Sequence, residues 1–408
     1  MTATSGVKRD TKVIGVVSLA HGCSHFYQLA LPPLFPLIHA QEGYDYAELG
    51  VVVVALYLAS ALCQPAAGFL VDRFGARVML LCGLAIQAGA TVLIGVLPFY
   101  EALFVLAIAV GIGNSVFHPC DYSVMSATIS EQRLGRAYSI HMLGGFLGYA
   151  LAPAALTVLG TTWGWQSAII AAGLAGFVIL ALVAAWSGDF RDSRHVRRTE
   201  TLPETKFGEI IGSLFQGPIL LCWLFFAIMA MAQIGLQSKS VSILSLPDTF
   251  AIDIETAGKI LTAYLLATAV GVMCGGYIAE RTHRHDTVVA VGYGIAAMLM
   301  LVLWRMTPAA ETIFAIYIAV GIIYGLAFPS RDIIVRNATP KESSGKVFGF
   351  VYSGMDFGSL VTPAMFGWLI DIGASQSAFL CIAVLWILSI LVLKASGAAA
   401  SKRAPVGT

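Results

Sequence analysis

The chain has 408 residues, of which 58% are hydrophobic and only 12% are charged, whereas roughly 25% of the residues in an ordinary soluble domain are charged. A water-soluble globule of this size cannot cover its surface with 24 basic and 23 acidic side chains, so the composition excludes most soluble classes. The net charge of +1 offers no basic surface for a nucleic-acid partner. A lipid bilayer, crossed by helices of about 20 to 25 residues, accounts for this composition.

Twelve apolar segments bounded by charged or turn-forming residues predict twelve membrane-spanning helices. They cover residues 12–38, 47–71, 76–98, 102–129, 135–160, 165–187, 215–245, 255–279, 286–306, 311–337, 345–370 and 376–396. The most polar stretch of the chain separates the sixth segment from the seventh. We therefore expect an all-α membrane protein with an N-terminal six-helix bundle over residues 1–187, a cytoplasmic linker over 188–214 and a C-terminal six-helix bundle over 215–408.

The basic residues predict the orientation of the chain, because Lys and Arg accumulate in cytoplasmic loops. If the N-terminus is cytoplasmic, all but four of the 24 Lys and Arg residues fall on the cytoplasmic side. The exceptions are Lys239, Lys259, Arg305 and Arg331. No small-residue cleavage site follows the basic N-terminal stretch, so the first apolar segment is expected to be retained as a span. The expectation is a multi-pass protein of a bacterial-type cytoplasmic (inner) membrane with both termini cytoplasmic.

An internal repeat relates the two halves of the chain. The sequence from Phe117, FHPCDYSVMSATISEQRLGRAYSIHMLGGFLGYALAP, aligns without a gap on the sequence 210 residues later. This offset pairs Pro119 with Pro329, Gly135 with Gly345, Arg136 with Lys346, Gly144 with Gly354, Gly148 with Gly358 and Pro153 with Pro363. We interpret the two halves as parallel repeats of one six-helix unit.

The loop after the second segment reads GFLVDRFGAR from Gly68. The glycine allows two helices to approach closely, Asp72 can accept hydrogen bonds from a helix N-terminus or an Arg, and Arg73 can face an anionic leaflet. This loop resembles the signature loop of the major facilitator superfamily, except that Ala76 stands where the first of two basic residues is expected. Through the repeat, the resemblance covers nearly the whole chain.

The resemblance implies a fold of two pseudo-symmetric six-helix bundles and a gating latch in the signature loop. It assigns the latch to Asp72 and Arg73, with Glu280 and Arg281 in the second-half copy. That copy lacks the second glycine of the motif.

A narrower resemblance lies in the first half. The segments HGCSHFYQLALPPLFP from His21, FHP from Phe117 and GRAYSIHMLGGFLG from Gly135 resemble the fosmidomycin-resistance branch of facilitator exporters. Exporters often carry Gly-Pro in the fifth helix, where this chain has Ala152 before Pro153. The glycines of that helix are therefore interpreted either as a hinge or as tight helix packing.

Ionisable side chains at membrane depth are expensive and normally face a cavity or a partner. The apolar segments contain His21, His25, His118, Asp121, His141, Lys239, Arg331, Asp332 and Asp356. His21 and His25 share one helix face, as do His118 and Asp121. The repeat places Arg331 at the position equivalent to Asp121. Because the family fold arranges the first, fourth, seventh and tenth helices around a central cavity, we expect Asp121 and Arg331 to face each other.

Candidate roles follow from residue type. Substrate binding is assigned to His21, His25, Tyr27, Gln28, His118, Gln237, Lys239, Arg331 and Tyr352. Proton coupling is assigned to Asp121, His118, Asp332 and Asp356. Packing roles stay open, since a buried His is more often a hydrogen-bonded packing residue, Asp332 can simply position Arg331, and Lys239 can extend toward the membrane surface.

No P-loop, HExxH or GxSxG motif occurs, so neither ATP-driven transport nor an enzyme is predicted, and no cofactor or resident metal is expected. The favoured hypothesis is a monomeric secondary transporter that exports a small, anionic organic compound or drug, coupled to protons, by alternating access. Uptake of a small organic acid by symport uses the same residues. A third hypothesis treats His21, His25 and His118 as ligands of a transported divalent metal or metal complex, although the sequence reveals no acidic or thiolate companion. A non-transporting membrane receptor is the fourth.

Overall fold

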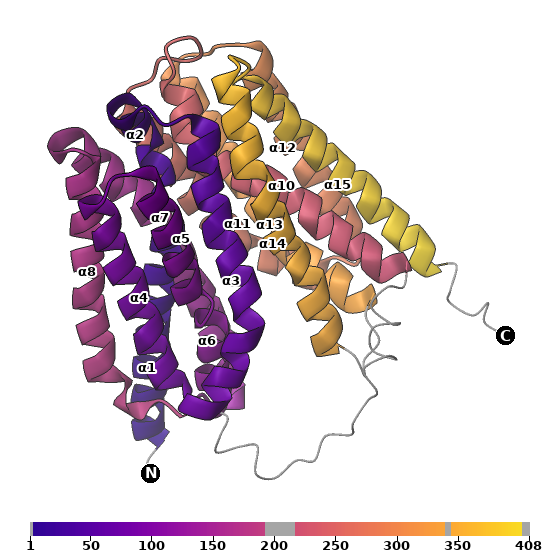
Figure 1. Cartoon of the computed structure of the whole chain (residues 1–408). Coiled ribbons are helices and arrows are strands. Elements are labelled where there is room, and N and C mark those ends of the chain that lie inside the picture. Colours follow the sequence, from indigo (N-terminus) through magenta and orange to yellow (C-terminus); the bar gives the residue numbers. More distant parts are fainter. Residues whose placement is uncertain (1–2, 192–216, 339–343, 402–408) are drawn as a thin grey trace. The chain divides into compact units, whose positions relative to one another are not determined.

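The computed structural model describes residues 3–191, 217–338 and 344–401, and these residues form helices joined by short connections, with no strand (Figure 1). Helices suit a chain in lipid because each satisfies its own backbone hydrogen bonds. In the N-terminal half they are α1 (Ala3–Gln28), η1 (Pro32–Leu34), α2 (Phe35–Glu42), α3 (Tyr46–Phe74), α4 (Ala76–Val96), α5 (Tyr100–Asn114), α6 (Phe117–Thr128), α7 (Glu131–Trp163), α8 (Trp165–Trp186) and η2 (Ser187–Asp189). In the C-terminal half they are α10 (Gly217–Ser245), α11 (Ile254–Arg281), α12 (His285–Arg305), α13 (Ala310–Ala338), α14 (Ser344–Asp371) and α15 (Ser377–Ser401).

The predicted twelve spans are confirmed. Within the described ranges, ten helical stretches are long and apolar enough to cross a membrane, with α5 and α6 together forming one of them, Tyr100–Thr128. The helices α1 and α14 complete the twelve. Large apolar side chains also face outward, such as Leu62 and Phe69, which are 70% and 78% exposed. Exposed apolar surface of this kind fits lipid better than water.

Two of the predicted spans are interrupted at prolines. The segment predicted over residues 12–38 is helical only to Gln28, because Pro32 and Pro33 follow in a separate 3₁₀ turn. The segment predicted over 102–129 breaks between α5 and α6. Pro119 has no N–H to donate to the carbonyl of Ser115, and its ring crowds that carbonyl, so the helix restarts at Phe117, two residues before the proline.

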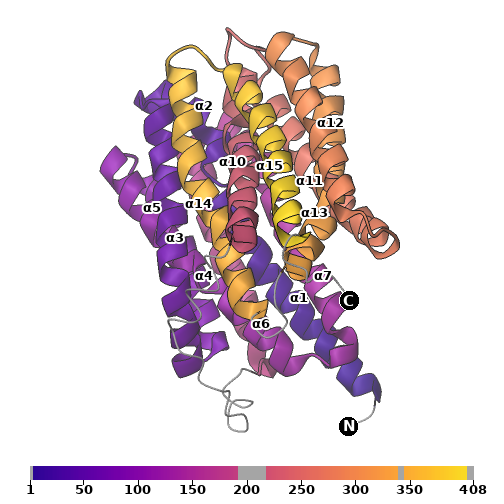
Figure 2. The same ribbon diagram turned by 90° about the vertical axis from the view of Figure 1, so that its right-hand side faces the viewer.

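The chain divides into two compact units, Met1–Thr201 with Ile254–Thr262, and Leu202–Asp253 with Ala263–Thr408. Most of the predicted linker over 188–214 lies outside the described residues. Two pairings of equivalent helices recur in the two units. In the first, α1 packs on α7 and α4 on α8; in the second, α10 packs on α14 and α12 on α15. Figure 2 shows α10 running between α14 and α15. This shared pattern matches the repeat in the sequence.

Repeat-related glycines bring these helix pairs into backbone contact. A Cβ at Gly144 would lie 2.8 Å from the Ser18 carbonyl oxygen, and one at Gly148 would overlap the backbone of Gly22. In the second unit, Gly354 meets the carbonyl oxygen of Trp223, and Gly358 that of Ala227. The glycines of α7 and α14 therefore permit close packing against α1 and α10.

The signature loop contains a glycine in a special conformation. Gly75, which links α3 to α4, has a φ of 93°, a backbone conformation that residues with a Cβ rarely adopt. In the second half, His283 stands at the equivalent position, and α11 and α12 are joined by the longer connection Thr282–Arg284 instead. The missing second glycine therefore corresponds to a different turn.

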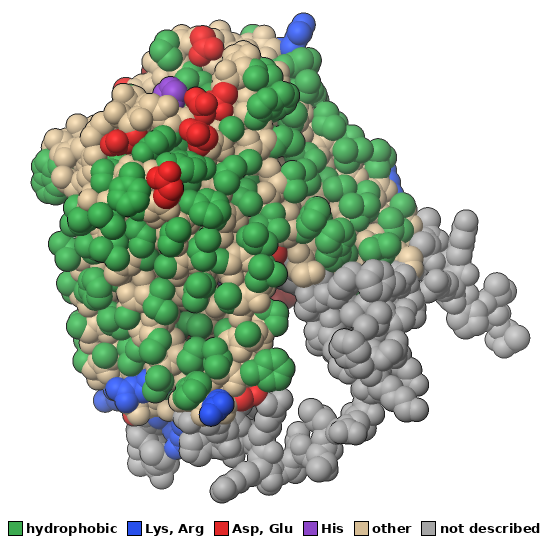
Figure 3. Space-filling model, in the orientation of Figure 1, with side chains coloured by type: hydrophobic (Ala, Val, Ile, Leu, Met, Phe, Trp, Pro, Cys, Tyr) green, Lys and Arg blue, Asp and Glu red, His purple; other side chains and the backbone are tan. Residues whose placement is uncertain are grey.

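Charges are segregated along the first unit. On the face seen in Figure 3, acidic side chains gather at the end where α2 meets α3, hydrophobic side chains cover the flank, and basic side chains gather at the end where α1 begins.

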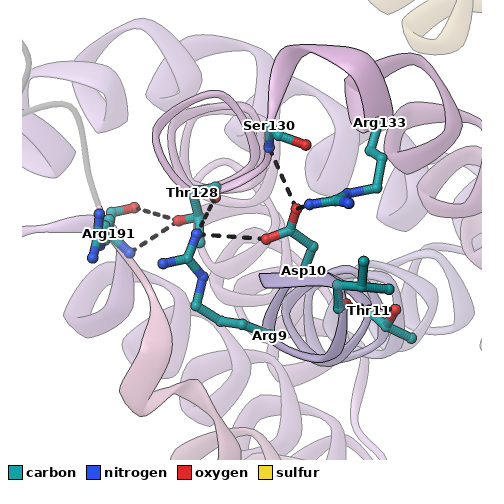
Figure 4. A network of polar contacts seen from close by, with 8 residues as sticks. Arg9, Asp10, Thr11, Thr128, Ser130, Arg133 and Arg191 are labelled. Atoms are coloured by element: carbon teal, nitrogen blue, oxygen red, sulfur yellow. Dashed lines mark hydrogen bonds and ion pairs between the residues drawn. The ribbon is translucent and has the colours of Figure 1, made fainter. Parts of the chain in front are cut away.

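At the basic end, Asp10 of α1 is only 1% exposed. Its carboxylate accepts hydrogen bonds from Arg133 Nη2 at 2.6 Å and Nε at 3.0 Å, and from the Ser130 N–H at 3.4 Å (Figure 4). Arg9 donates to the Thr128 carbonyl at 3.1 Å. These contacts connect α1 to the turn between α6 and α7.

This network makes stability depend on pH. Burial opposes ionisation of Asp10, but the hydrogen bonds from Arg133 and Ser130 and the charges of Arg133 and Arg9 outweigh it, so its pKa lies below the ordinary 3.8. A carboxyl whose pKa is lowered by folding stabilises the protein above its unfolded pKa, and this contribution is lost as the pH falls through the folded pKa. We expect Asp10→Asn to reduce stability at pH 7 by roughly 1.5–3 kcal/mol, and the difference to shrink as the pH falls through the lowered pKa of Asp10, as measured by thermal melts in detergent.

Asp189→Asn is the matched control for Asp10→Asn. Asp189 pairs with Lys12 at 2.7 Å, but both side chains are more than 40% exposed. Exposed pairs contribute about 0–1 kcal/mol. An Asp189→Asn loss as large as that of Asp10→Asn, or a difference that persists at low pH, would contradict the interpretation.

Candidate functional site

Four histidines from three helices meet in the interior of the first unit. His21 and His25 come from α1, His118 from α6 and His141 from α7. The ring centroid of His21 lies 3.8 Å from that of His141, 4.3 Å from that of His25 and 5.3 Å from that of His118. Sequence reasoning expected the first three to act together and left His141 outside the site. We call these four residues, with Asp121, the His–Asp cluster.

Asp121 is the acidic member of the cluster. Its side chain is fully buried, with Oδ2 3.1 Å from His21 Nδ1 and 3.7 Å from His141 Nε2. Apart from these two ion-pair contacts, several buried polar atoms of the cluster have no hydrogen-bond partner within the described part of the chain: His25 Nδ1, His118 Nδ1, His141 Nδ1 and Asp121 Oδ1. A buried polar atom without a partner costs about 1–3 kcal/mol. When several buried polar atoms without partners lie close together, the usual explanation is that an ion, a proton or a ligand binds there.

The backbone around the cluster explains how the side chains converge. Gly145 of α7 leaves room for two imidazoles, since a Cβ there would lie 3.0 Å from His21 Nε2 and 3.1 Å from His25 Cε1. The spacing of His141, Gly144, Gly145 and Gly148 puts them on one helix face, against α1. On α6, the helix that restarts before Pro119 places His118 in its first turn and Asp121 one turn later.

A network of amides and hydroxyls adjoins the cluster. Asn114 Oδ1 accepts hydrogen bonds from Ser24 Oγ at 2.6 Å and Gln28 Nε2 at 2.8 Å, while Asn114 Nδ2 donates to Ser60 Oγ at 2.7 Å. Tyr149 donates to Gln28 Oε1 at 2.7 Å, and its ring centroid lies 4.3 Å from that of His25. The predicted residue Gln28 thus adjoins the cluster through Tyr149. Asn114 was missed from the sequence, although it is a lone amide in an apolar segment, next to the helix break.

Tyr27 does not belong to this group. Its hydroxyl donates to the carbonyl of Ala172 in α8 at 3.1 Å, and its ring fills the space beside Gly176. Its neighbours in the structure support a packing role.

In the second unit, Arg331 of α13 is buried to 1% exposure. Its Nε donates to Asp332 Oδ1 at 2.9 Å, and its guanidinium carbon lies 3.7 Å from the ring centroid of Phe328 and 4.7 Å from that of Phe226. The neighbouring carboxylate and the aromatic faces offset the cost of burying the charge. Asp332 itself is 38% exposed, which favours its positioning role.

Lys239 is a second buried cation of that unit, fully buried near the end of α10, with Asp371 as its charged neighbour. Gln237 is 3% exposed on the same helix. Arg331 Nη1 lies 3.2 Å from Met229 Sδ of α10. Met229 precedes Lys239 by ten residues, which is about 15 Å along the axis of α10. Arg331 and Lys239 therefore stand at different levels of the unit.

The remaining predicted residues are placed as follows. Asp356 is exposed on α14, and the side chain of Tyr352 lies outside the described residues. In the predicted latch, Asp72 is half-buried and Arg73 lies over the Phe74 ring at 5.3 Å, whereas Arg281 covers the Tyr277 ring at 3.3 Å and Glu280 is exposed. Asp121 and Arg331 belong to different units, so their pairing stays a prediction.

Comparison with known proteins finds similar chains among transporters. The model of the Major Facilitator Superfamily matches residues 17–244 and 236–406. The chain is 24% identical over 365 residues to the fosmidomycin resistance protein of Escherichia coli K12, covering 88% of this chain and 87% of that protein. It is 24% identical over 389 residues to a probable sulfoacetate transporter of Cupriavidus necator, covering 90% and 88%. A bacterial homolog of the human lysosomal transporter Spinster, solved in an inward-facing and occupied conformation, has the same fold, with a TM-score of 0.75, 15% identity and 96% of both chains covered.

Proposed function

The chain belongs to the major facilitator superfamily and is a multi-pass membrane transporter rather than an enzyme, and on that premise we propose that it exports a small organic anion in exchange for protons. The observation that carries the proposal is the distribution of buried charge. One unit holds the His–Asp cluster, while the other holds the buried cations Arg331 and Lys239. Buried ionisable groups in a membrane protein mark ion and substrate pathways.

The proton side of the proposal rests on the first unit. Asp121 and His118 are the principal proton carriers, since a buried carboxylate beside imidazoles, several of whose polar atoms have no hydrogen-bond partner within the described residues, can take up and release protons. Asp332 and Asp356 are secondary carriers in the second unit. Asp332 contacts Arg331 directly, so a proton on Asp332 changes the net charge offered to a substrate.

The substrate side rests on the cations. A guanidinium held by aromatic faces binds carboxylate, sulfonate or phosphonate groups in a bidentate manner. Lys239 and Gln237 form a second polar level. The remaining proposed substrate contacts are His21, His25, Gln28, His118 and Tyr352, whereas the hydrogen bond from Tyr27 to the Ala172 carbonyl of α8 favours packing for Tyr27.

The transport cycle is alternating access between two six-helix bundles, 1–187 and 215–408, joined by the segment 188–214. Asp72 with Arg73, and Glu280 with Arg281, act as latches at the end of the bundles where the basic residues gather. We propose that this end is cytoplasmic, with both termini on that side, because Lys and Arg accumulate there. The protein would act as a monomer in the lipid of a bacterial inner membrane.

Export and an anionic substrate are also supported by relatives. One relative is named for resistance to fosmidomycin and another for transport of sulfoacetate, an organic anion. Uptake of an organic acid by symport is the second candidate, because the same buried groups serve either direction.

Direction and drive are tested in everted membrane vesicles. With an acid interior, exchange for protons predicts accumulation of the transported sulfonate, phosphonate or carboxylate inside the vesicles, abolished by a protonophore. Accumulation only in right-side-out vesicles with an acid exterior would support symport and contradict export.

Arg331→Ala tests the anionic substrate. We expect ligand-induced thermal stabilisation by sulfonates, phosphonates and carboxylates to disappear, with affinity reduced at least tenfold, since a charge-assisted hydrogen bond contributes about 1.5–3 kcal/mol. Arg331→Lys retains the charge but loses the bidentate geometry, so an intermediate loss is expected. A screen in which cationic drugs bind wild type and Arg331→Ala equally, while anions bind neither, would overturn the anion assignment.

A further inference from the structure

The His–Asp cluster has the composition of a transition-metal site as well as that of a proton site. One nitrogen from each of His21, His118 and His141 lies within 4.8 Å of the corresponding atom of the other two. Imidazole is the preferred ligand of Zn²⁺, Co²⁺, Ni²⁺ and Cu²⁺. Three protein ligands with an open fourth position are the usual arrangement where a zinc ion also binds water or a substrate.

Three helices bring these ligands together independently. His21 comes from α1, His118 from α6 and His141 from α7, so the arrangement depends on tertiary packing rather than on one helix's periodicity. The backbone contact between α1 and α7 and the room left by Gly145 make the convergence possible. Around a zinc ion with Zn–N distances of about 2.0–2.1 Å, tetrahedral nitrogens lie about 3.3 Å apart. The three nitrogens of the cluster, within 4.8 Å of one another, are at most about 1.5 Å farther apart than that separation.

Asp121 supplies the acidic companion that the sequence alone does not reveal. Its Oδ2 lies 3.1 Å from His21 Nδ1. Metal-bound histidines typically donate their second N–H to a carboxylate, which fixes the ring and strengthens the ligand. Asp121 is placed to do this for His21, and its negative charge partly balances that of a buried cation.

The unsatisfied atoms provide a separate argument. His141 is 1% exposed and Asp121 is fully buried, yet His118 Nδ1, His141 Nδ1 and Asp121 Oδ1 have neither a hydrogen-bond nor an ion-pair partner in the described part of the chain. A bound cation takes lone pairs from nitrogen and oxygen and so offsets this cost. His25, although its ring centroid lies 4.3 Å from that of His21, is outside the group of three.

We propose that His21, His118 and His141 bind one divalent transition-metal ion, with Asp121 orienting His21, in the interior of the first unit. The site goes beyond the proposed transport function and does not depend on it. Metal and protons are alternative occupants, since both take the same nitrogen lone pairs.

The test measures direct metal binding to the purified full-length protein. The protein carries an affinity tag that contains no histidine, and a chelator removes bound metal before the titration. Titration with Co²⁺, followed by its visible absorption, and with Zn²⁺, followed by calorimetry, should give one ion per chain. We expect His118→Gln and His141→Gln each to weaken binding at least 100-fold, and Asp121→Asn to weaken it about 10- to 100-fold. His39→Gln is the matched control, because His39 lies outside the cluster, with Nδ1 2.8 Å from the Tyr44 carbonyl oxygen.

A second measurement needs no substitution. X-ray absorption at the zinc edge of the loaded wild-type protein should count three imidazole ligands. Absence of stoichiometric binding, one imidazole or none, or equal binding by wild type and the His118→Gln variant would overturn the proposal. Because none of these readouts involves transport, failure of the metal site leaves the exporter proposal intact, and failure of proton-driven export leaves the metal site intact.

Discussion

Asp121→Asn is expected to abolish proton-driven accumulation of the substrate while leaving exchange of substrate for substrate. An asparagine has nearly the same shape but carries no exchangeable acidic proton. A gradient of about one pH unit supplies about 1.4 kcal/mol per proton, enough for about tenfold accumulation. The variant should therefore show no accumulation above the external concentration in everted vesicles, with its counterflow rate within a few-fold of wild type.

The control for Asp121→Asn is Asp189→Asn, which neutralises an exposed aspartate paired with Lys12 at the basic end of the unit. This control should accumulate substrate as wild type does. A purely structural Asp121 would predict that counterflow and thermal stability fall together with accumulation. Full accumulation by Asp121→Asn would remove this residue from the coupling mechanism.

Gly148→Ala is expected to have the largest effect on stability. The added Cβ would lie 2.7 Å from the Gly22 carbonyl carbon and 2.9 Å from its Cα, and backbone cannot move aside as a flexible side chain does. Overpacking of this kind costs typically 1–3 kcal/mol and occasionally more. Separation of α1 from α7 would also pull His21 away from His141. We expect a lower melting temperature in detergent and a low yield of folded protein.

Gly135→Ala provides a control on the same helix, because a Cβ at Gly135 meets nothing within 4 Å. It should be neutral or stabilise by about 0.5–1 kcal/mol, as is usual when Ala replaces Gly in a helix. Gly358→Ala tests the repeat, since its Cβ would meet the backbone of Ala227 in the second unit. Equal stability of the Gly135→Ala and Gly148→Ala variants would contradict the packing argument.

The fold was largely predictable from the sequence because its main determinants are local. Twelve spans follow from the lengths of the apolar segments, and the glycines 144 and 148 recur at 354 and 358 because the same close helix contact occurs in each half. The interruptions were not predicted. Proline is tolerated in the middle of α7, α13 and α14, and hydropathy alone does not distinguish these positions from Pro119.

The candidate site was only partly predictable. The spacing of His21 with His25, and of His118 with Asp121, identified shared helix faces but not their partners on other helices. His141 joins them through the approach of α1 to α7, and its position on the glycine face of α7 was a signal in the sequence. The position of Asn114 depends on the break between α5 and α6. Tyr27 points toward α8, although its neighbour Gln28 contacts Asn114 in the polar network.

Exchange of substrate for protons through this one protein would be seen as substrate-dependent proton flux in proteoliposomes. A pH-sensitive dye trapped in the lumen would report proton movement when the transported anion is added on one side. We expect a flux that requires both substrate and protein, runs opposite to the substrate, and is absent in Asp121→Asn. Substrate transport by the wild-type protein with no accompanying proton flux would contradict it.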